Sequence, residues 1–138
     1  VKVYLDASVV LRLVLRERGP SLDLATVAGS IHSELVRIEC LRTLGRLRLQ
    51  RRLDEGETAR ARKAAFEILN TSGLIPLTSA ILARASGPFP APLGTLDAIH
   101  LATALTFRDV TGEELVLATH DQGLAEAARS MNLDVVGL

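Results

Sequence analysis

The sequence predicts one α/β domain, residues 1–138, in which a central parallel sheet of about five strands is flanked by helices on both faces. Three observations lead to this prediction. Short apolar segments typical of strands alternate along the chain with longer segments of helical periodicity. The length of 138 residues suits a single domain, and a hydrophobic content of 48% is enough for a sizeable core. The chain also lacks an internal repeat or a linker that would divide it.

The first half of the chain supplies two strands and three helices. Residues 2–5 form a buried strand, and a helix over residues 7–15 follows it after a tight turn. Residues 26–32, TVAGSIH, predict the second strand. Helical periodicity then runs through residues 33–49 and again through residues 55–71.

The second half continues the alternation. Residues 73–78, GLIPLT, predict a third strand, and Pro76 favours an edge position or a strand end because proline has no backbone N–H. The segment SGPFPAPLG, residues 86–94, is a loop. A helix over 95–107, a strand over 115–119, a helix over 121–130 and a last strand over 133–137 complete the chain.

Composition excludes several classes of protein. No apolar run reaches the ~18 residues of a membrane span, and no secretory signal is recognisable, so we expect a cytoplasmic protein. The single cysteine, Cys40, fits a reducing compartment. The 16 basic and 16 acidic residues balance, which gives no general attraction to nucleic acid. With four aromatic residues and no tryptophan, any contact with nucleic acid should involve its backbone rather than base stacking.

The basic residues are nevertheless concentrated in one region. Nine of the 16 lie between residues 37 and 63. Such a run is usually a solvated helix face. The alternative interpretation is a surface that contacts phosphates or a partner protein. Composition alone leaves both interpretations open.

Carboxylates from distant parts of the sequence should meet at one edge of the sheet. Asp6 ends the first strand and Asp121 follows the 115–119 strand, and the carboxyl ends of parallel strands share an edge. Asp97 lies in the first turn of its helix. In the 33–49 helix, Glu39 shares a face with Arg42 and Arg46, apart from a core stripe, so it can also reach this edge. That stripe consists of Val36, Cys40, Thr43, Leu44 and Leu47.

Each acid also has a purely structural interpretation. Asp6 and Asp121 can cap the helices that follow them, Asp97 can favour the positive end of its helix, and Glu39 can pair with Arg42. Taken together, the four acids favour a cation site, because clustered carboxylates repel one another without one. Oxygen ligands suit Mg²⁺ or Mn²⁺ rather than Zn²⁺. Such a site suits hydrolysis of phosphodiester bonds.

Four segments carry a resemblance to a known family. In this order, YLDAS, SELVRIE, LDAIHLATAL and LATHD resemble the PIN-domain nucleases, and within them the VapC-type ribonuclease toxins of toxin–antitoxin pairs. The resemblance implies a PIN-like fold and a Mg²⁺- or Mn²⁺-dependent endoribonuclease. It also implies a homodimer and a cognate antitoxin whose tail blocks the site. By this resemblance, the acidic residues of the family's site correspond to Asp6, Glu39, Asp97 and Asp121, with Ser8 and Thr119 beside them.

The resemblance and the residue types together suggest roles. We expect Asp6, Asp97 and Asp121 to hold the metal, and Glu39 to bind a metal or orient the attacking water. Ser8 and Thr119 position a water, a carboxylate or a phosphate oxygen, unless they only cap helices. Arg42 and Arg46 contact RNA phosphates or the antitoxin. For His100 and His120 a surface or supporting position is favoured, and Cys40 should be inert in the core.

Other functions fit the sequence less well. Phosphatases that use an early aspartate need a second aspartate where this chain has Ser8, and a lysine after a late strand, whereas Lys2 and Lys63 are the only lysines. The glycine motif of dinucleotide binders is missing from DASVVLRL. Two alternatives remain open: a housekeeping PIN-domain nuclease that processes RNA, and a catalytically silent PIN scaffold that acts as a binding module.

Overall fold

The computed structural model describes residues 1–19 and 21–137. Along the chain the elements are β1 (Lys2–Leu5), α1 (Ala7–Val14), α2 (Leu24–Ala28), β2 (Ile31–Ser33), α3 (Glu34–Leu49), α4 (Glu55–Thr71), β3 (Gly73–Ile75), α5 (Ser79–Ala85), α6 (Thr95–Thr111), β4 (Leu115–Ala118), α7 (Gln122–Ser130) and β5 (Asp134–Val136). Among the described residues, none of the helices has the length and apolar character needed to cross a membrane.

The five strands form one sheet in the order β3-β2-β1-β4-β5, and every neighbouring pair is parallel. This confirms the predicted α/β class and the parallel five-stranded sheet. In the central part, Leu5 of β1 is in register with His32 of β2 and with Ala118 of β4. The residues that follow these three positions therefore emerge together at the carboxyl edge of the sheet.

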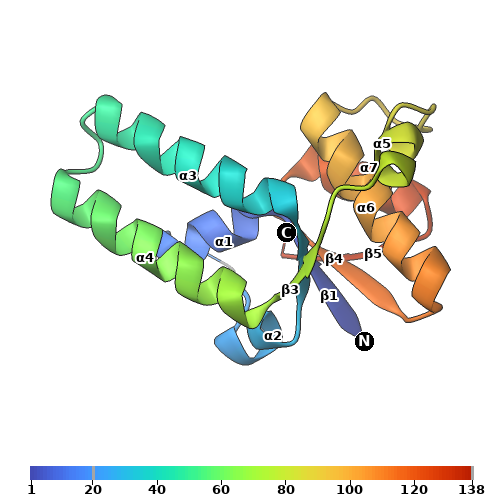
Figure 1. Ribbon diagram of the computed structural model, residues 1–138, viewed down its shortest axis with the longest axis horizontal. Coiled ribbons are helices and arrows are strands. Elements are labelled where there is room, and N and C mark those ends of the chain that lie inside the picture. Colours follow the sequence, from blue (N-terminus) through green and yellow to red (C-terminus); the bar gives the residue numbers. More distant parts are fainter. Residues whose placement is uncertain (20, 138) are drawn as a thin grey trace.

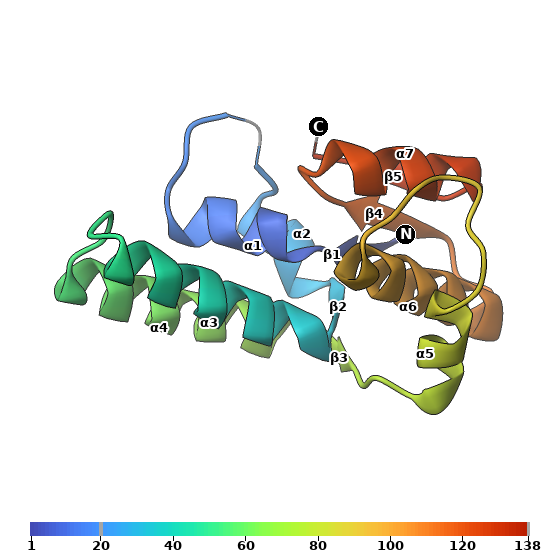
Figure 2. The same ribbon diagram turned by 90° about the horizontal axis from the view of Figure 1, so that it is seen from above.

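Helices cover both faces of the sheet, as predicted (Figures 1 and 2). Because successive strand residues point to opposite faces, Leu5 and Ala118 enter one core and Tyr4 and Leu117 enter the other. The first core also contains buried residues of α1, α3 and α4, and the second contains those of α6 and α7. The two views also show α3 and α4 side by side in a long hairpin that extends away from the sheet.

The predicted core stripe of α3 is largely correct. Val36, Cys40 and Leu44 are fully buried, whereas Thr43 and Leu47 are only partly buried. On the outer side of the same helix, the guanidinium of Arg37 lies 4.9 Å from the centre of the Phe66 ring of α4. Burial of the Cys40 thiol, with the nearby charges of Glu39 and Asp6, raises its pKa to about 12, so the thiol is chemically inert.

Two predicted strands were wrong in part, and one short helix was not predicted. The segment 26–32 is not a strand throughout: α2 occupies its first part, because Asp23 caps this helix by accepting a bond from the Thr26 amide, and β2 begins only at Ile31. The third strand ends at Ile75 rather than residue 78, since Pro76 cannot donate to the ladder. The short helix α5 was missed; Thr78 caps it. The edge position of β3 and the loop over 86–94 are confirmed.

Candidate active site

Asp6 stands where β1 ends and α1 begins, and both of its carboxylate oxygens accept hydrogen bonds. Oδ1 accepts from the Ala7 amide at 2.8 Å. Oδ2 accepts from the Ser8 hydroxyl at 2.7 Å and from the Thr119 hydroxyl at 2.8 Å. The residue is only 5% exposed. Asp6 therefore caps α1, as the structural interpretation expected, and is also held in one orientation by Ser8 of α1 and by Thr119, which directly follows β4.

Ser8 and Thr119 tie the two central loops together. The Ser8 oxygen accepts from the backbone amide of His120 at 3.0 Å, and the Thr119 oxygen accepts from the amide of Asp121 at 3.0 Å. The helix-capping interpretation is wrong for both residues, because Asp6 caps α1 and Asp121 caps α7. Thr119 is fully buried, so its contact is with the Asp6 carboxylate and not with solvent or substrate.

Asp97 comes from the first turn of α6 and is partly buried. The pKa of its carboxyl group is raised to about 6, first by burial and then by the negative charges of Asp121, Asp6 and Glu39, against the opposing effect of His100. These charges act on one another only because the structure brings all four carboxylates to the same region. Asp121 is the exposed member, and its Oδ1 accepts from the Leu124 amide at 2.8 Å.

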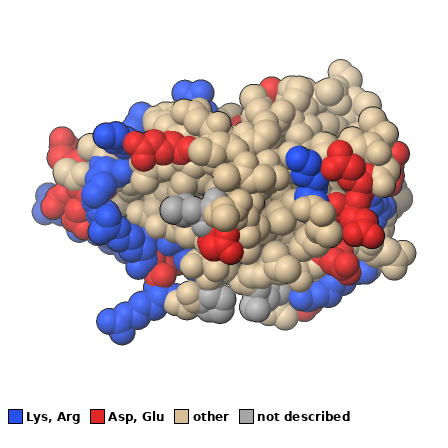
Figure 3. Space-filling view, turned by 90° about the horizontal axis from the view of Figure 1, so that it is seen from below, with Lys and Arg blue, Asp and Glu red and all other residues tan. Residues whose placement is uncertain are grey.

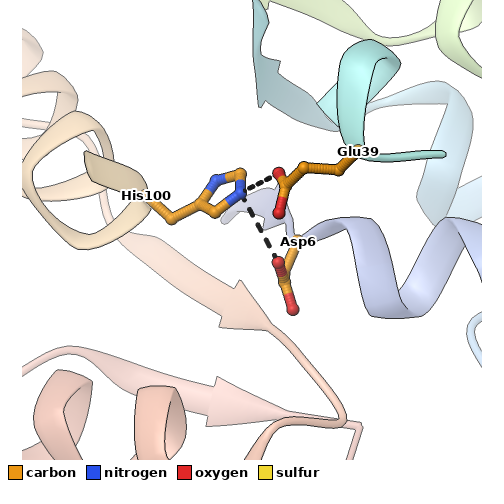
Figure 4. Close-up of side chains that lie close together, drawn as sticks. All are labelled: Asp6, Glu39 and His100. Atoms are coloured by element: carbon orange, nitrogen blue, oxygen red, sulfur yellow. Dashed lines mark hydrogen bonds and ion pairs between the residues drawn. The ribbon is translucent and has the colours of Figure 1, made fainter. Parts of the chain in front are cut away.

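Glu39 of α3 meets an unexpected partner, His100 of α6 (Figure 4). The His100 Nε2 lies 2.5 Å from Glu39 Oε1 and 3.7 Å from Asp6 Oδ1. On the other side of the ring, Nδ1 lies 2.8 Å from the Tyr4 hydroxyl. His100 is fully buried, so a surface position is wrong for this histidine. Glu39 does not pair with Arg42, which the structural interpretation had suggested.

Burial alone would lower the pKa of His100. The hydrogen bond and charge of Glu39, with the charges of Asp6 and Asp97, outweigh it and raise the pKa of the imidazole above its usual value. The buried Tyr4 phenol has a pKa well above its ordinary value, through burial and then the charge of Asp6. The phenol is therefore uncharged, and the histidine links it to the acidic cluster.

Sequence reasoning missed the roles of Tyr4 and His100. A signal for His100 was present: it follows Asp97 by three residues on a helix, a spacing that places both side chains on the same face. Tyr4 had no such signal, because the partner of its hydroxyl is the His100 ring, which is distant in the sequence. For His120, Nδ1 bonds the carbonyl of Gly137, which ties this histidine to the end of β5.

The side chains fit a divalent cation. Asp6, Glu39 and His100 each offer one ligand atom, and these atoms lie within 4.8 Å of one another. Two carboxylates at this spacing, with Asp97 and Asp121 beside them, form the oxygen-rich set that Mg²⁺ or Mn²⁺ prefers. The raised pKa of Asp97 agrees with this, because after burial its main causes are the charges of Asp121 and Asp6, which His100 only partly offsets.

Arg42 and Arg46 are exposed on α3, three and seven residues beyond Glu39, so they lie on its side of the helix. The Arg46 guanidinium donates to the Thr43 hydroxyl at 3.3 Å. Within the described chain, neither arginine forms an ion pair with the acidic residues, and both extend the same face of α3 away from the carboxylates.

The chain is similar in sequence to a known family and to named relatives. A sequence profile described as the PIN domain matches residues 3–130. Ribonuclease VapC46 of Mycobacterium tuberculosis is 35% identical over 139 residues, covering 97% of this chain and 95% of the relative. Ribonuclease VapC47 of the same species is 29% identical over 142 residues, covering 94% and 91%.

One solved structure shares the fold. The crystal structure of PAE2754 from Pyrobaculum aerophilum superposes with a TM-score of 0.67 at 19% sequence identity, and the match covers 98% of this chain and 83% of that one. At this identity the similarity concerns the fold alone.

Proposed function

This chain belongs to the PIN-domain family, and from that premise we propose that it is a VapC-type toxin, an endoribonuclease that hydrolyses RNA phosphodiester bonds with Mg²⁺ or Mn²⁺. The observation that carries the proposal is the meeting of Asp6, Glu39, Asp97 and Asp121 at the carboxyl edge of the sheet. The ribonuclease names of the two mycobacterial relatives support the RNA substrate.

The four acids and the two neighbouring hydroxyl residues have different roles in this proposal. Asp6, Asp97 and Asp121 hold the metal directly or through water, and Glu39 binds a metal or orients the attacking water. A bound Mg²⁺ or Mn²⁺ lowers the pKa of the attacking water and stabilises the leaving oxygen. Ser8 and Thr119 fix the Asp6 carboxylate through their hydroxyls.

His100 acts as a positioning residue. Its Nε2 bonds Glu39 Oε1, and its ring is supported by the Tyr4 hydroxyl, so the glutamate is directed toward Asp6 instead of toward solvent. Arg42 and Arg46 continue this face outward and are placed to meet RNA phosphates or the C-terminal part of an antitoxin.

The first experiment is cleavage of a structured RNA pool by purified protein with Mg²⁺, with Mn²⁺ and with EDTA. We expect cutting only with metal, and its loss in Asp6→Asn. The matched control is Asp109→Asn, because Asp109 lies on α6 but pairs with Arg84 and Arg108 instead of the acidic cluster. Cutting by Asp6→Asn at the wild-type rate, or cutting in EDTA, would contradict the proposed site.

The biological role has its own tests. For a toxin, inducing the wild-type gene in bacteria should arrest growth, and inducing Asp6→Asn should not. A small DNA-binding protein encoded beside the gene should relieve the arrest and bind the toxin. A housekeeping PIN-domain nuclease would cleave RNA without arrest. Sedimentation of the purified protein tests the proposed homodimer.

A further inference from the structure

The α3–α4 hairpin carries a strong excess of positive charge. Residues 42–63 contain eight basic and three acidic side chains, a formal charge of +5, and since the whole chain has 16 of each, the remaining residues together carry −5. Figure 3 shows Lys and Arg gathered over the end of the molecule that this hairpin forms. We use the name hairpin-end cluster for the basic side chains of residues 48–63, namely Arg48, Arg51, Arg52, Arg60, Arg62 and Lys63.

The three acidic residues between positions 42 and 63 make contacts within the hairpin. Asp54 and Glu57 form a capping box at the start of α4, with bonds of 2.7 and 3.1 Å between each side chain and the other's backbone. Glu55 lies 3.5 Å from Arg48. Within the described chain, the other five members of the hairpin-end cluster have no ion pair, and all are exposed. Their positive charge is therefore available to a partner.

Arg51 holds a backbone conformation that favours glycine. Its φ is 58°, and α3 ends in a Schellman motif around it: the Arg51 amide donates to Arg48 and the Arg52 amide donates to Leu47. At the corresponding position after α6 the chain has Gly112. An arginine in the left-handed region destabilises the fold relative to glycine, so a glycine at this position would remove the side chain without weakening the fold.

The surface suits a phosphate backbone better than a protein. A stable protein interface usually has an apolar core, whereas the hollow at this end is lined by charged residues around a single Leu53. Ten positions of α3 separate Glu39 from the last helical residue, Leu49, about 15 Å at the helical rise, and Arg51 follows two residues later. Arg42 and Arg46 lie between Glu39 and Leu49. A nucleic-acid strand leaving the acidic site along α3 would reach the hairpin end.

We propose that the hairpin-end cluster binds the phosphate backbone of the substrate RNA, outside the nucleotides at the cleaved bond. This rests on the proposed function for the identity of the substrate, but binding is measured without catalysis. The cluster increases affinity for long or structured RNA and leaves the chemistry at the acidic site unchanged. With few aromatic side chains available for stacking, the contacts are electrostatic and independent of sequence.

The test measures RNA binding by fluorescence anisotropy. The probe is a labelled bulk tRNA pool, in EDTA, with every variant in an Asp6→Asn background so that the RNA stays intact. Arg51→Gln/Arg52→Gln/Arg62→Gln is expected to weaken binding about tenfold near 100 mM salt and to reduce the slope of log affinity against log salt by about 2–3. Lys2→Gln/Arg18→Gln/Arg129→Gln changes net charge equally outside the hairpin and should retain the parent affinity.

A single glycine substitution separates binding from folding. Arg51→Gly relieves the left-handed strain, so it should keep or raise Tm while lowering RNA affinity and reducing the salt slope by about 1. Arg16→Gly is the matched control, because Arg16 has a φ of 53° in the same motif after α1. It should keep or raise Tm without a comparable loss of affinity.

The outcomes distinguish this inference from the proposed function. Unchanged tRNA binding by the hairpin triple variant would overturn the inference, even if the wild-type enzyme cuts RNA. An equal loss in both triple variants would also overturn it, since total charge would then explain the binding. If only the hairpin variant loses affinity while the wild-type enzyme cuts no RNA, the RNA-binding role of the cluster stands and the proposed function falls. Polyglutamate serves as a second probe, for an acidic protein. If the hairpin triple variant loses polyglutamate binding but keeps tRNA binding, the surface binds an acidic protein instead.

Discussion

Replacing Asp97 with asparagine should stabilise the metal-free protein while removing a proposed metal ligand. The carboxyl group of Asp97 has a pKa of about 6 in the folded protein against 3.8 as the reference value. Each pKa unit corresponds to about 1.4 kcal/mol, so the ionised form is disfavoured by about 3 kcal/mol before correction. Because Asp97 is only partly buried, solvent screening reduces this to roughly 1–1.5 kcal/mol.

The sign follows from proton linkage. Raising the folded pKa means that protonated Asp97 favours folding at low pH, and this contribution is lost as pH rises from about 4 to about 6. Above that window the wild type carries an ionised carboxylate that the fold disfavours, whereas asparagine remains neutral. Among the described residues no hydrogen bond contributes to the pKa of Asp97, so asparagine loses little.

Thermal denaturation in EDTA measures the effect. At pH 7.5, Asp97→Asn should raise Tm by roughly 2–5 °C, and the gain should fall to about half at pH 5. Adding Mg²⁺ should raise the Tm of the wild type more than that of the variant. On the same helix, Asp109→Asn should not raise Tm, because bonds from Arg84 and Arg108 lower the pKa of Asp109. A variant no more stable than wild type at pH 7.5, or a gain independent of pH, would refute the reasoning.

Three further substitutions or treatments test other parts of the site. Thr119→Val keeps the shape but removes the buried hydroxyl that donates to Asp6, so urea denaturation should show a loss of about 1–3 kcal/mol; an unchanged midpoint would contradict that contact. Cys40, fully buried with a raised pKa, should react with a thiol reagent only after unfolding, and rapid labelling of the native protein would show that the core is misplaced. His100→Leu leaves Glu39 without its buried partner, so Tm in EDTA should fall by several degrees and recover partly with Mg²⁺, whereas an increase in Tm would refute the pairing.

Much of the fold could be predicted because strand and helix periods alternate clearly. The shared carboxyl edge of parallel strands was enough to predict that Asp6 and Asp121 lie at the same edge. The placement of β1 beside β4, the pairing that brings Asp6 and Thr119 together, was not predicted from the sequence. The errors occurred where local capping decided the structure. Asp23 and Thr78 start short helices in segments whose composition also suits strands or loops, and periodicity cannot separate these in fewer than eight residues.

The candidate site was predictable only in its ionised residues. Carboxylates at strand ends and helix starts can be recognised in a sequence as candidate site residues, because burying a charged group is costly unless it has a partner. His100 depends on a contact 61 positions away, with Glu39, and Tyr4 on one 96 positions away, with His100. Such contacts are set by how α3 and α6 approach β1, which no local pattern specifies.

The structure also shows how support is distributed among the four acids. Asp6 has hydrogen-bond donors on both oxygens, and Glu39 has the His100 ring, so these two carboxylates keep their positions without a cation. Within the described residues Asp97 has no such donor, and burial and the charges of Asp121 and Asp6 disfavour its ionised form. A cation would therefore relieve most repulsion on the α6–α7 side, while the β1–α3 side supplies a fixed geometry. It follows that losing Asp97 should weaken metal binding without loosening the site, whereas losing His100 should disturb the position of Glu39 even when metal is present.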